Sequence, residues 1–133
     1  MILIDTTVLI DAFKGMQNEK VALFQNAIQH NLICGISEYI YLEILQGAKT
    51  SNEFNNLNEH LLDMNIYFLP KTVKTYEKAA NLYIDLRKQG ITPRSTIDIL
   101  IALTAIEYNL YLLHNDRDFD VMSNRIHELR IYG

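Results

Sequence analysis

The sequence predicts an alternating α/β fold built around a mainly parallel sheet, and three features support this. Four short apolar runs, at residues 2–4, 32–36, 66–69 and 110–113, have the length of strands, and residues 129–132 form a weaker fifth. Helical patterns lie between these runs, an order that is typical of parallel sheets. The 133 residues contain no repeat and no Pro/Gly/Ser-rich linker, so we expect residues 1–133 to form one domain.

The helical patterns are of two kinds. Two predicted helices are amphipathic, with apolar residues every three or four positions. The first stripe consists of Phe54, Leu57, Leu61 and Met64, and the second consists of Val73, Tyr76, Ala80 and Tyr83. The segments 37–48 and 95–108 differ because they are apolar nearly all round. Helices of that kind are buried on most sides, so we expect both to lie inside the molecule.

Composition excludes several classes of protein. Twelve basic and sixteen acidic residues give a net charge of −4, which argues against a general basic surface for long nucleic-acid duplexes. Cys34 is the only cysteine, so a disulfide framework and a cysteine-cluster zinc site are both excluded. No signal-peptide pattern follows Met1, and the longest stretch without charged residues is too polar to span a bilayer. We therefore expect a soluble cytoplasmic protein with no membrane partner.

Four carboxylates stand in unusual places. Glu43 and Asp98 lie within the two apolar helices, where an ionised carboxylate is costly unless it is paired or bound to a cation. Asp5 and Asp116 follow the runs 2–4 and 110–113. The carboxyl ends of parallel strands are where ligand sites form in open α/β sheets. We therefore expect these four acids, far apart in sequence, to converge at one edge of the sheet.

Helix capping is the competing interpretation for three of the acids. Asp5 could cap a helix that begins after the first strand, and Asp116 could cap the turn that leads into Phe119. Asp98 stands three residues after Ser95, so the two could form a capping box. The sequence leaves both interpretations open for each of these acids taken singly. Their shared position at the ends of strands and the starts of helices favours a common site.

A gathered set of carboxylates would need a cation. Acids about 5 Å apart repel each other by about 3 kcal/mol at an effective dielectric constant of about 20. Proton uptake or a divalent cation relieves this repulsion. An all-oxygen site favours Mg²⁺ or Mn²⁺ over zinc. Such ions bind phosphate oxygens and activate water, so the pattern indicates a metal-dependent phosphoryl-transfer site.

Four segments carry a resemblance to a known family. They are residues 3–11 (LIDTTVLID), 36–48 (ISEYIYLEILQGA), 95–105 (STIDILIALTA) and 112–119 (LLHNDRDF). In this order they resemble the PIN-domain nucleases, and within them the VapC-type toxins of toxin–antitoxin pairs. The resemblance covers essentially the whole chain. It implies a three-layer α/β/α fold with a central sheet of four to five strands, and a Mg²⁺- or Mn²⁺-dependent endoribonuclease that cuts tRNA or rRNA.

The resemblance also assigns roles to individual acids. Asp5, Glu43, Asp98 and Asp116 match the family's catalytic, metal-binding quartet. Asp118 would be an auxiliary acid near a second metal position. In such a site a metal-bound water attacks the phosphorus in line, so no covalent nucleophile is needed.

Other residues of these segments would support the quartet or bind the substrate. Thr6 matches the hydroxyl residue that follows the first acid, where it could hydrogen-bond a carboxylate or a metal-bound water. Ser95 precedes the helix that carries Asp98. His114 stands where relatives commonly have Thr, and it could contact a substrate phosphate or have a structural role. Four basic residues could contact RNA phosphates: Arg87, Lys88, Arg94 and Arg117. Solvated charges at the end of a helix explain Arg87 and Lys88 at least as well, whereas Arg94 and Arg117 stand closer to the acids, which favours a role for them.

The resemblance implies partners as well as a substrate. These are a cognate VapB-type antitoxin, a homodimer and a toxin–antitoxin hetero-oligomer. A groove for the antitoxin could be lined by Phe13, Leu23, Phe24, Phe54 and Leu57, although core packing explains the same residues. The alternative function is a non-catalytic PIN-fold module that binds RNA or protein. Such a module would be expected to have lost at least one acid of the quartet.

Overall fold

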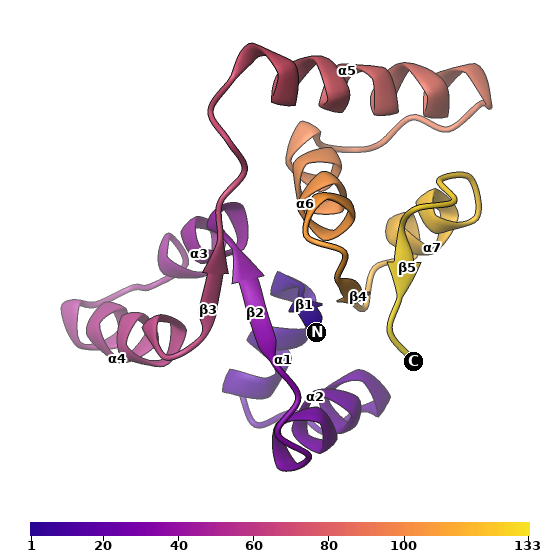
Figure 1. Ribbon diagram of the computed structural model, residues 1–133. Coiled ribbons are helices and arrows are strands. Elements are labelled where there is room, and N and C mark those ends of the chain that lie inside the picture. Colours follow the sequence, from indigo (N-terminus) through magenta and orange to yellow (C-terminus); the bar gives the residue numbers. More distant parts are fainter.

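The computed structural model describes residues 1–133 and contains one five-stranded sheet. The strands are β1 Ile2–Ile4, β2 Cys34–Ser37, β3 Asn65–Tyr67, β4 Tyr111–Leu113 and β5 Arg130–Ile131. The helices are α1 Thr6–Phe13, α2 Glu19–Gln29, α3 Glu38–Leu45, α4 Ser51–Leu62, α5 Val73–Lys88, α6 Thr96–Glu107 and α7 Arg117–Ser123. All four strand pairs are parallel, in the order β3-β2-β1-β4-β5 (Figure 1). The predicted α/β fold with a parallel sheet is therefore confirmed.

The predicted starts of two strands are wrong, and helix termination is the reason. The strand at 32–36 begins instead at Cys34, because the Leu32 amide donates to the Ala27 carbonyl and closes the end of α2. Asn31, the residue before Leu32, has the left-handed backbone conformation of a Schellman motif. The strand at 110–113 likewise begins one residue late, because the Leu110 amide closes the end of α6.

Strands β3 and β5 are shorter than the apolar runs that predicted them. The run 66–69 contributes only its first half to β3, because the Leu69 amide donates to Glu38 Oε2 and leaves the sheet. The weak run 129–132 contributes only Arg130–Ile131 to β5. Both corrections concern edge strands, which pair on one side only.

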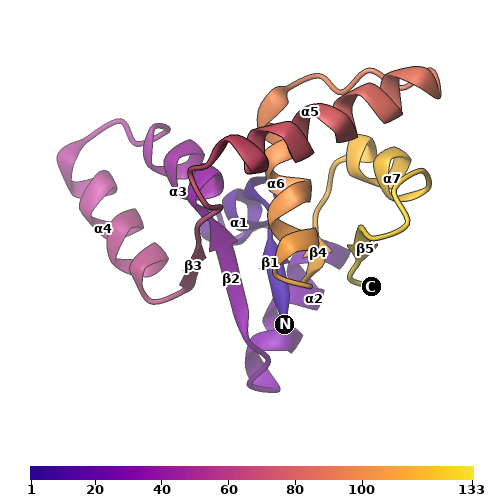
Figure 2. The same ribbon diagram turned by 45° about the horizontal axis from the view of Figure 1, so that its top comes forward.

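Helix α6 is the buried helix of the fold. Seven consecutive residues, 99–105, are buried, because α6 packs against β4 on one side and against α5 on the other. Figure 2 shows α6 in front of the sheet with α1 and α2 behind it. The layers are therefore helices, sheet and helices, and the expectation of a buried helix at 95–108 is correct.

Helix α3 meets the same expectation in part. Its buried residues are Ile40, Ile44 and Leu45, whereas the side chain of Leu42 is 60% exposed. The other residues of the helix are half-buried, because α3 contacts α1, α4, α6, β2 and β3. The predicted burial of segment 37–48 on most sides is therefore wrong at Leu42 and, beyond the end of the helix, at Gln46 and Gly47, which are exposed. No helix of the structure combines the length and apolar character needed to cross a membrane.

The strand order reverses direction between β1 and β4. From β1 the chain passes outward to β2 and β3, and it then returns to place β4 on the other side of β1. The Asp5 amide donates to the Leu113 carbonyl at 2.9 Å, which joins the carboxyl ends of these two central strands. A reversal of this kind leaves a crevice at the carboxyl ends of the strands. The segments that follow β1 and β4 therefore meet at the place where α/β folds hold their ligands.

Candidate active site

Five carboxylates surround this crevice, and we call them the acidic site: Asp5, Glu43, Asp98, Asp116 and Asp118. Asp5 directly follows β1, and Asp116 and Asp118 lie at the start of α7, just after β4. Asp98 lies in the first turn of α6, and Glu43 lies in α3. One carboxylate oxygen from each of Asp98, Asp116 and Asp118 can be chosen so that all three lie within 4.8 Å of one another. The structure thus brings together acids that are up to 113 positions apart in sequence, from Asp5 to Asp118.

Asp98 is the acid most affected by its surroundings. Burial is the largest cause that raises its pKa. The negative charges of Asp116, Asp5, Glu43 and Asp118 raise the pKa further, to about 6. No hydrogen bond offsets these effects. Burial and the neighbouring negative charges make the ionised form of this carboxyl group unfavourable at neutral pH. A nearby cation would stabilise the ionised form.

Two threonines hold the acids on the other side of the crevice. Thr6 Oγ1 donates to Glu43 Oε1 at 3.1 Å, and Thr7 Oγ1 donates to Asp5 Oδ2 at 2.7 Å. Burial raises the pKa of Asp5, and the hydrogen bonds from Thr7 lower it in part. Burial also raises the pKa of Glu43, which the Thr6 hydrogen bond partly offsets. These hydroxyl groups therefore orient two carboxylates without neutralising them.

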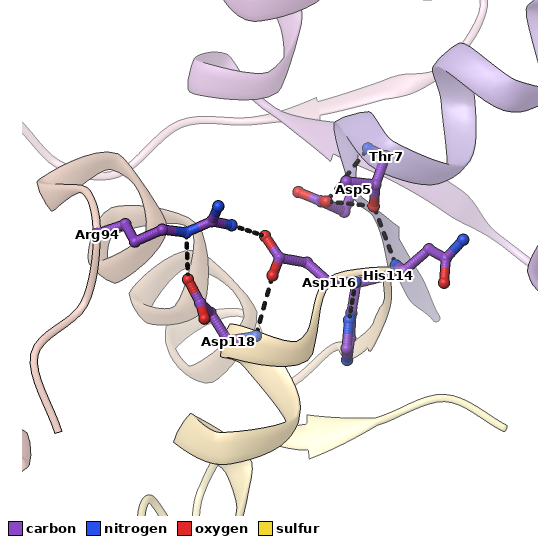
Figure 3. A network of polar contacts seen from close by, with 7 residues as sticks. Asp5, Thr7, Arg94, His114, Asp116 and Asp118 are labelled. Carbon is purple, nitrogen blue, oxygen red and sulfur yellow. Dashed lines mark hydrogen bonds and ion pairs between the residues drawn. The ribbon is translucent and has the colours of Figure 1, made fainter.

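The role of Thr7 was not found from the sequence. Its Oγ1 also accepts a hydrogen bond from the Asn115 amide at 3.0 Å, so one hydroxyl links the segments that follow β1 and β4. Figure 3 shows Thr7 between these two segments. The local signal is a hydroxyl residue two positions after an acid that precedes a helix. The contact with Asn115 crosses 108 positions of sequence and has no local signal.

Capping and convergence both occur at this edge of the sheet. Asp5 caps α1 by accepting from the Thr7 amide, and Asp116 caps α7 by accepting from the Asp118 amide. Ser95 caps α6 by accepting from the Ile97 amide at 3.0 Å. Strands that are followed by helices place helix N-termini along the same edge, so capping acids gather there. The two interpretations of the sequence are therefore compatible for Asp5 and Asp116, whereas Asp98 accepts no hydrogen bond and its predicted capping box with Ser95 is wrong.

Arg94 joins the two acids that follow β4. Its Nε donates to Asp118 Oδ2 at 2.6 Å, and its Nη2 donates to Asp116 Oδ2 at 2.9 Å (Figure 3). The sequence indicated a contact of Arg94 with RNA phosphates, but it did not reveal these ion pairs. The adjacent carboxylates raise the pKa of Arg94 further above its ordinary value. A resident positive charge is therefore part of the acidic site.

The remaining predicted site residues are His114, Arg117, Arg87 and Lys88, and their surroundings differ. His114 is 1% exposed, and its Nδ1 accepts from the Asp116 amide at 3.0 Å, which is the environment of a structural histidine. Burial lowers the pKa of His114. Arg117 is the exposed first residue of α7 and forms no ion pair. Arg87 and Lys88 lie at the end of α5, where Arg87 stacks on Tyr83, and neither pairs with an acid of the site.

The donor set fits a hard divalent cation. Every candidate ligand is a carboxylate oxygen, and neither a histidine nor a cysteine points into the cluster of Asp98, Asp116 and Asp118. The half-buried Asp98, surrounded by like charges and lacking a hydrogen-bond donor, fits a group whose partner is a cation. Oxygen ligands of this kind suit Mg²⁺ and Mn²⁺. The arrangement is a group of carboxylates that could hold such an ion at the switch point of a parallel sheet.

Comparison with known families places the chain in one of them. The sequence model of the PIN domain matches residues 2–124, so the chain belongs to the PIN-domain family. Among curated relatives, the chain is similar to the VapC ribonuclease Mb1587 of Mycobacterium bovis. The two are 29% identical over 124 residues, which cover 92% of each chain.

Solved structures show the same fold. VapBC2 from Rickettsia felis, bound to a DNA fragment from its promoter, superposes with a TM-score of 0.75 and 20% identity. The superposition covers 99% of this chain and 98% of the other. A toxin-antitoxin complex from Klebsiella pneumoniae superposes with a TM-score of 0.68 and 22% identity, covering 98% of this chain and 100% of the other.

Proposed function

We propose that this chain is a metal-dependent endoribonuclease and the toxin of a toxin–antitoxin pair. The observation that carries the proposal is the convergence of five carboxylates on the switch point between β1 and β4. Membership of the PIN-domain family and similarity to a protein named as a VapC ribonuclease support the same activity. The alternative of a non-catalytic module has no comparable support, because all four acids of the expected quartet are present and close together.

In this proposal the acids act as ligands and the threonines position them. Asp5, Glu43, Asp98 and Asp116 hold Mg²⁺ or Mn²⁺, and Asp118 is the auxiliary acid. When bound, the metal ion supplies positive charge to the phosphate and lowers the pKa of a water. Thr6 and Thr7 hold the Glu43 and Asp5 side chains, so that these two ligands need little reorganisation when substrate binds.

Basic residues at the rim of the acidic site would offset its negative charge and so favour the binding of an RNA backbone. Arg94 and Arg117 lie beside Asp116 and Asp118, and both side chains are exposed. We propose that they contact the phosphates on either side of the cleaved bond. Arg87 and Lys88, at the far end of α5, would contact more distant phosphates of a structured RNA such as a tRNA or an rRNA loop.

We also propose a VapB-type antitoxin, a homodimer and a toxin–antitoxin hetero-oligomer, in the cytoplasm. A hollow of about 680 Å³ lies between α1, α3 and α4, and its lining includes Phe13, Leu57 and Glu43. Two of the expected groove residues thus lie beside an acid of the site. Phe24, which was expected in the same groove, belongs to the hydrophobic core instead. A second hollow between α5 and α6 is mostly apolar and suits a surface that pairs with another chain.

The test is cleavage of cellular RNA by the purified chain with Mg²⁺, followed by sequencing of the fragment ends. We expect discrete cuts that EDTA stops. We also expect Asp5→Asn to abolish cleavage while the protein stays folded by circular dichroism. A matched control is Asp63→Asn, which makes the same charge change at the exposed end of α4 and should leave cleavage unchanged. Cleavage by Asp5→Asn at the rate of the unmodified chain would refute the proposed site.

A further inference from the structure

The ion pairs of Arg94 divide the acidic site into two parts. The guanidinium binds Asp118 through Nε at 2.6 Å and Asp116 through Nη2 at 2.9 Å. Asp98 accepts no hydrogen bond and forms no ion pair, although its charge acts on Arg94. Arg94 therefore pairs with two acids of the site and leaves Asp98, Asp5 and Glu43 without an ion pair.

The backbone holds Arg94 in place from both sides. Pro93 is buried, and Ser95 caps α6 with a hydrogen bond to the Ile97 amide. The Arg94 side chain is 71% exposed, so burial does not hold it. A planar guanidinium that makes two charge-assisted hydrogen bonds from an anchored backbone loses little conformational freedom in doing so. Arg94 is thus a pre-positioned cation.

The same ion pairs use one oxygen of each of the two acids that a second metal ion would need. The Oδ2 atoms of Asp116 and Asp118 both accept from Arg94, and Asp116 Oδ1 accepts from the Asp118 amide at 2.9 Å. A divalent cation between these two acids would have to displace the guanidinium. A cation beside Asp98 would also interact with Asp5 and Glu43, whose charges act on Asp98 and which do not pair with Arg94.

We propose that Arg94 takes the place of a second divalent cation, so that the acidic site binds a single metal ion. This inference rests on the proposed metal-dependent function. The metal ion is held by Asp98 with Asp5, Glu43 and Asp116 Oδ1, the Asp116 oxygen that does not pair with Arg94, while Arg94 neutralises Asp118 and the other oxygen of Asp116. A guanidinium has five N–H groups and Arg94 uses two here, so the others stay available for a substrate phosphate.

The test is the number of Mn²⁺ ions bound, measured by calorimetry and by the electron paramagnetic resonance signal of free Mn²⁺. We expect one bound ion for the unmodified chain and two for Arg94→Gln. The second ion of the variant should bind at least about tenfold more tightly than any second ion of the unmodified chain, because a competing charge has been removed. Arg117→Gln is the matched control, since it removes the neighbouring arginine that forms no ion pair, and it should bind one ion.

Further variants separate the possible failures. Arg94→Lys keeps the charge and should bind one ion, which distinguishes loss of charge from loss of structure. If Arg94→Gln is unfolded without metal, refolding on addition of two equivalents of Mn²⁺ supports the proposal, and refolding with one equivalent refutes it. Equal numbers of ions in the unmodified chain and Arg94→Gln would refute only the role of Arg94. If the unmodified chain and all the Arg94 variants bind Mn²⁺ no more tightly than Asp98→Asn does, the proposed metal-dependent function is refuted as well.

Discussion

Asp98 is the residue at which the charges of the acidic site have their largest effect. It is half-buried, four other carboxylates act on it, and its pKa is raised to about 6. Asp5 is more deeply buried than Asp98, and Glu43 is half-buried like it, but both accept hydrogen bonds, from Thr7 and Thr6, which oppose the rise in their pKa values. The difference between these acids lies in the hydrogen-bond donors around them.

The raised pKa of Asp98 predicts how stability depends on pH. Between about pH 4 and pH 6 the folded state holds a proton that the unfolded state has released, so the free energy of unfolding falls as pH rises through this window. Asp98→Asn cannot ionise and should escape part of this fall. In EDTA at about pH 7.5 it should be more stable than the unmodified chain by about 1 kcal/mol, after allowance for solvent screening.

Urea unfolding at about pH 5 and about pH 7.5 measures this difference. The gain from Asp98→Asn should be smaller at the lower pH, where the Asp98 carboxyl is protonated in the folded chain. Asp63→Asn, at an exposed position outside the acidic site, should follow the pH dependence of the unmodified chain. A gain from Asp98→Asn that is the same at both pH values would contradict the raised pKa.

At the scale of elements, the fold depends on how strands and helices join at one edge of the sheet. Residues of the segments that follow β1 and β4 serve as helix caps and as members of the acidic site. A different close contact lies between β2 and β3, where Gly35 has no side chain and so allows β3 to approach β2 closely. An alanine Cβ at position 35 would meet the Tyr67 ring and would lie 2.7 Å from the Asn65 carbonyl oxygen.

This close approach predicts the effect of Gly35→Ala. Because backbone and a packed ring oppose the new methyl group, β3 must shift away from β2, and we expect a loss of about 1–3 kcal/mol in the free energy of unfolding. Thermal or urea unfolding measures the loss. Gly47→Ala is the control, since its new Cβ would lie 3.4 Å from the nearest atom, the Ile44 carbonyl oxygen. Equal stability of the two variants would show that β2 and β3 do not approach so closely in solution.

At the scale of the whole molecule, the acidic site joins parts of the chain that are far apart in sequence. Its carboxylates come from the end of β1, from α3, from α6 and from the start of α7. In the unfolded chain these acids are separated and bind a divalent cation weakly. Metal binding should therefore be linked to global folding.

This linkage predicts that Mn²⁺ raises the melting temperature. At a concentration about a hundredfold above its dissociation constant, a ligand that binds only the folded state adds about 2.7 kcal/mol of stability. Differential scanning fluorimetry with and without Mn²⁺ measures the shift. Asp5→Asn should show a much smaller shift, whereas Asp63→Asn should show the full one. A shift of equal size in Asp5→Asn and the unmodified chain would place the bound metal elsewhere.

Much of the architecture could be predicted because the signals are local. Apolar runs, capping residues and the periodicity of helices act over a few positions, and they correctly indicated the α/β order and the buried helix α6. They failed where a distant contact decides the outcome. Leu42 is exposed because no element covers that side of α3, and Leu69 leaves β3 because Glu38 accepts its amide.

The order of residues along the chain fixes which residue types stand at the ends of the strands, and with them the carboxylate oxygens that suit a hard cation. How those acids face one another depends on the strand order, which sets β4 beside β1. The folded arrangement also lets Thr7 join the two central segments and lets Arg94 pair with acids 22 and 24 positions away. Such contacts depend on packing between distant segments, and no periodicity along the chain encodes them.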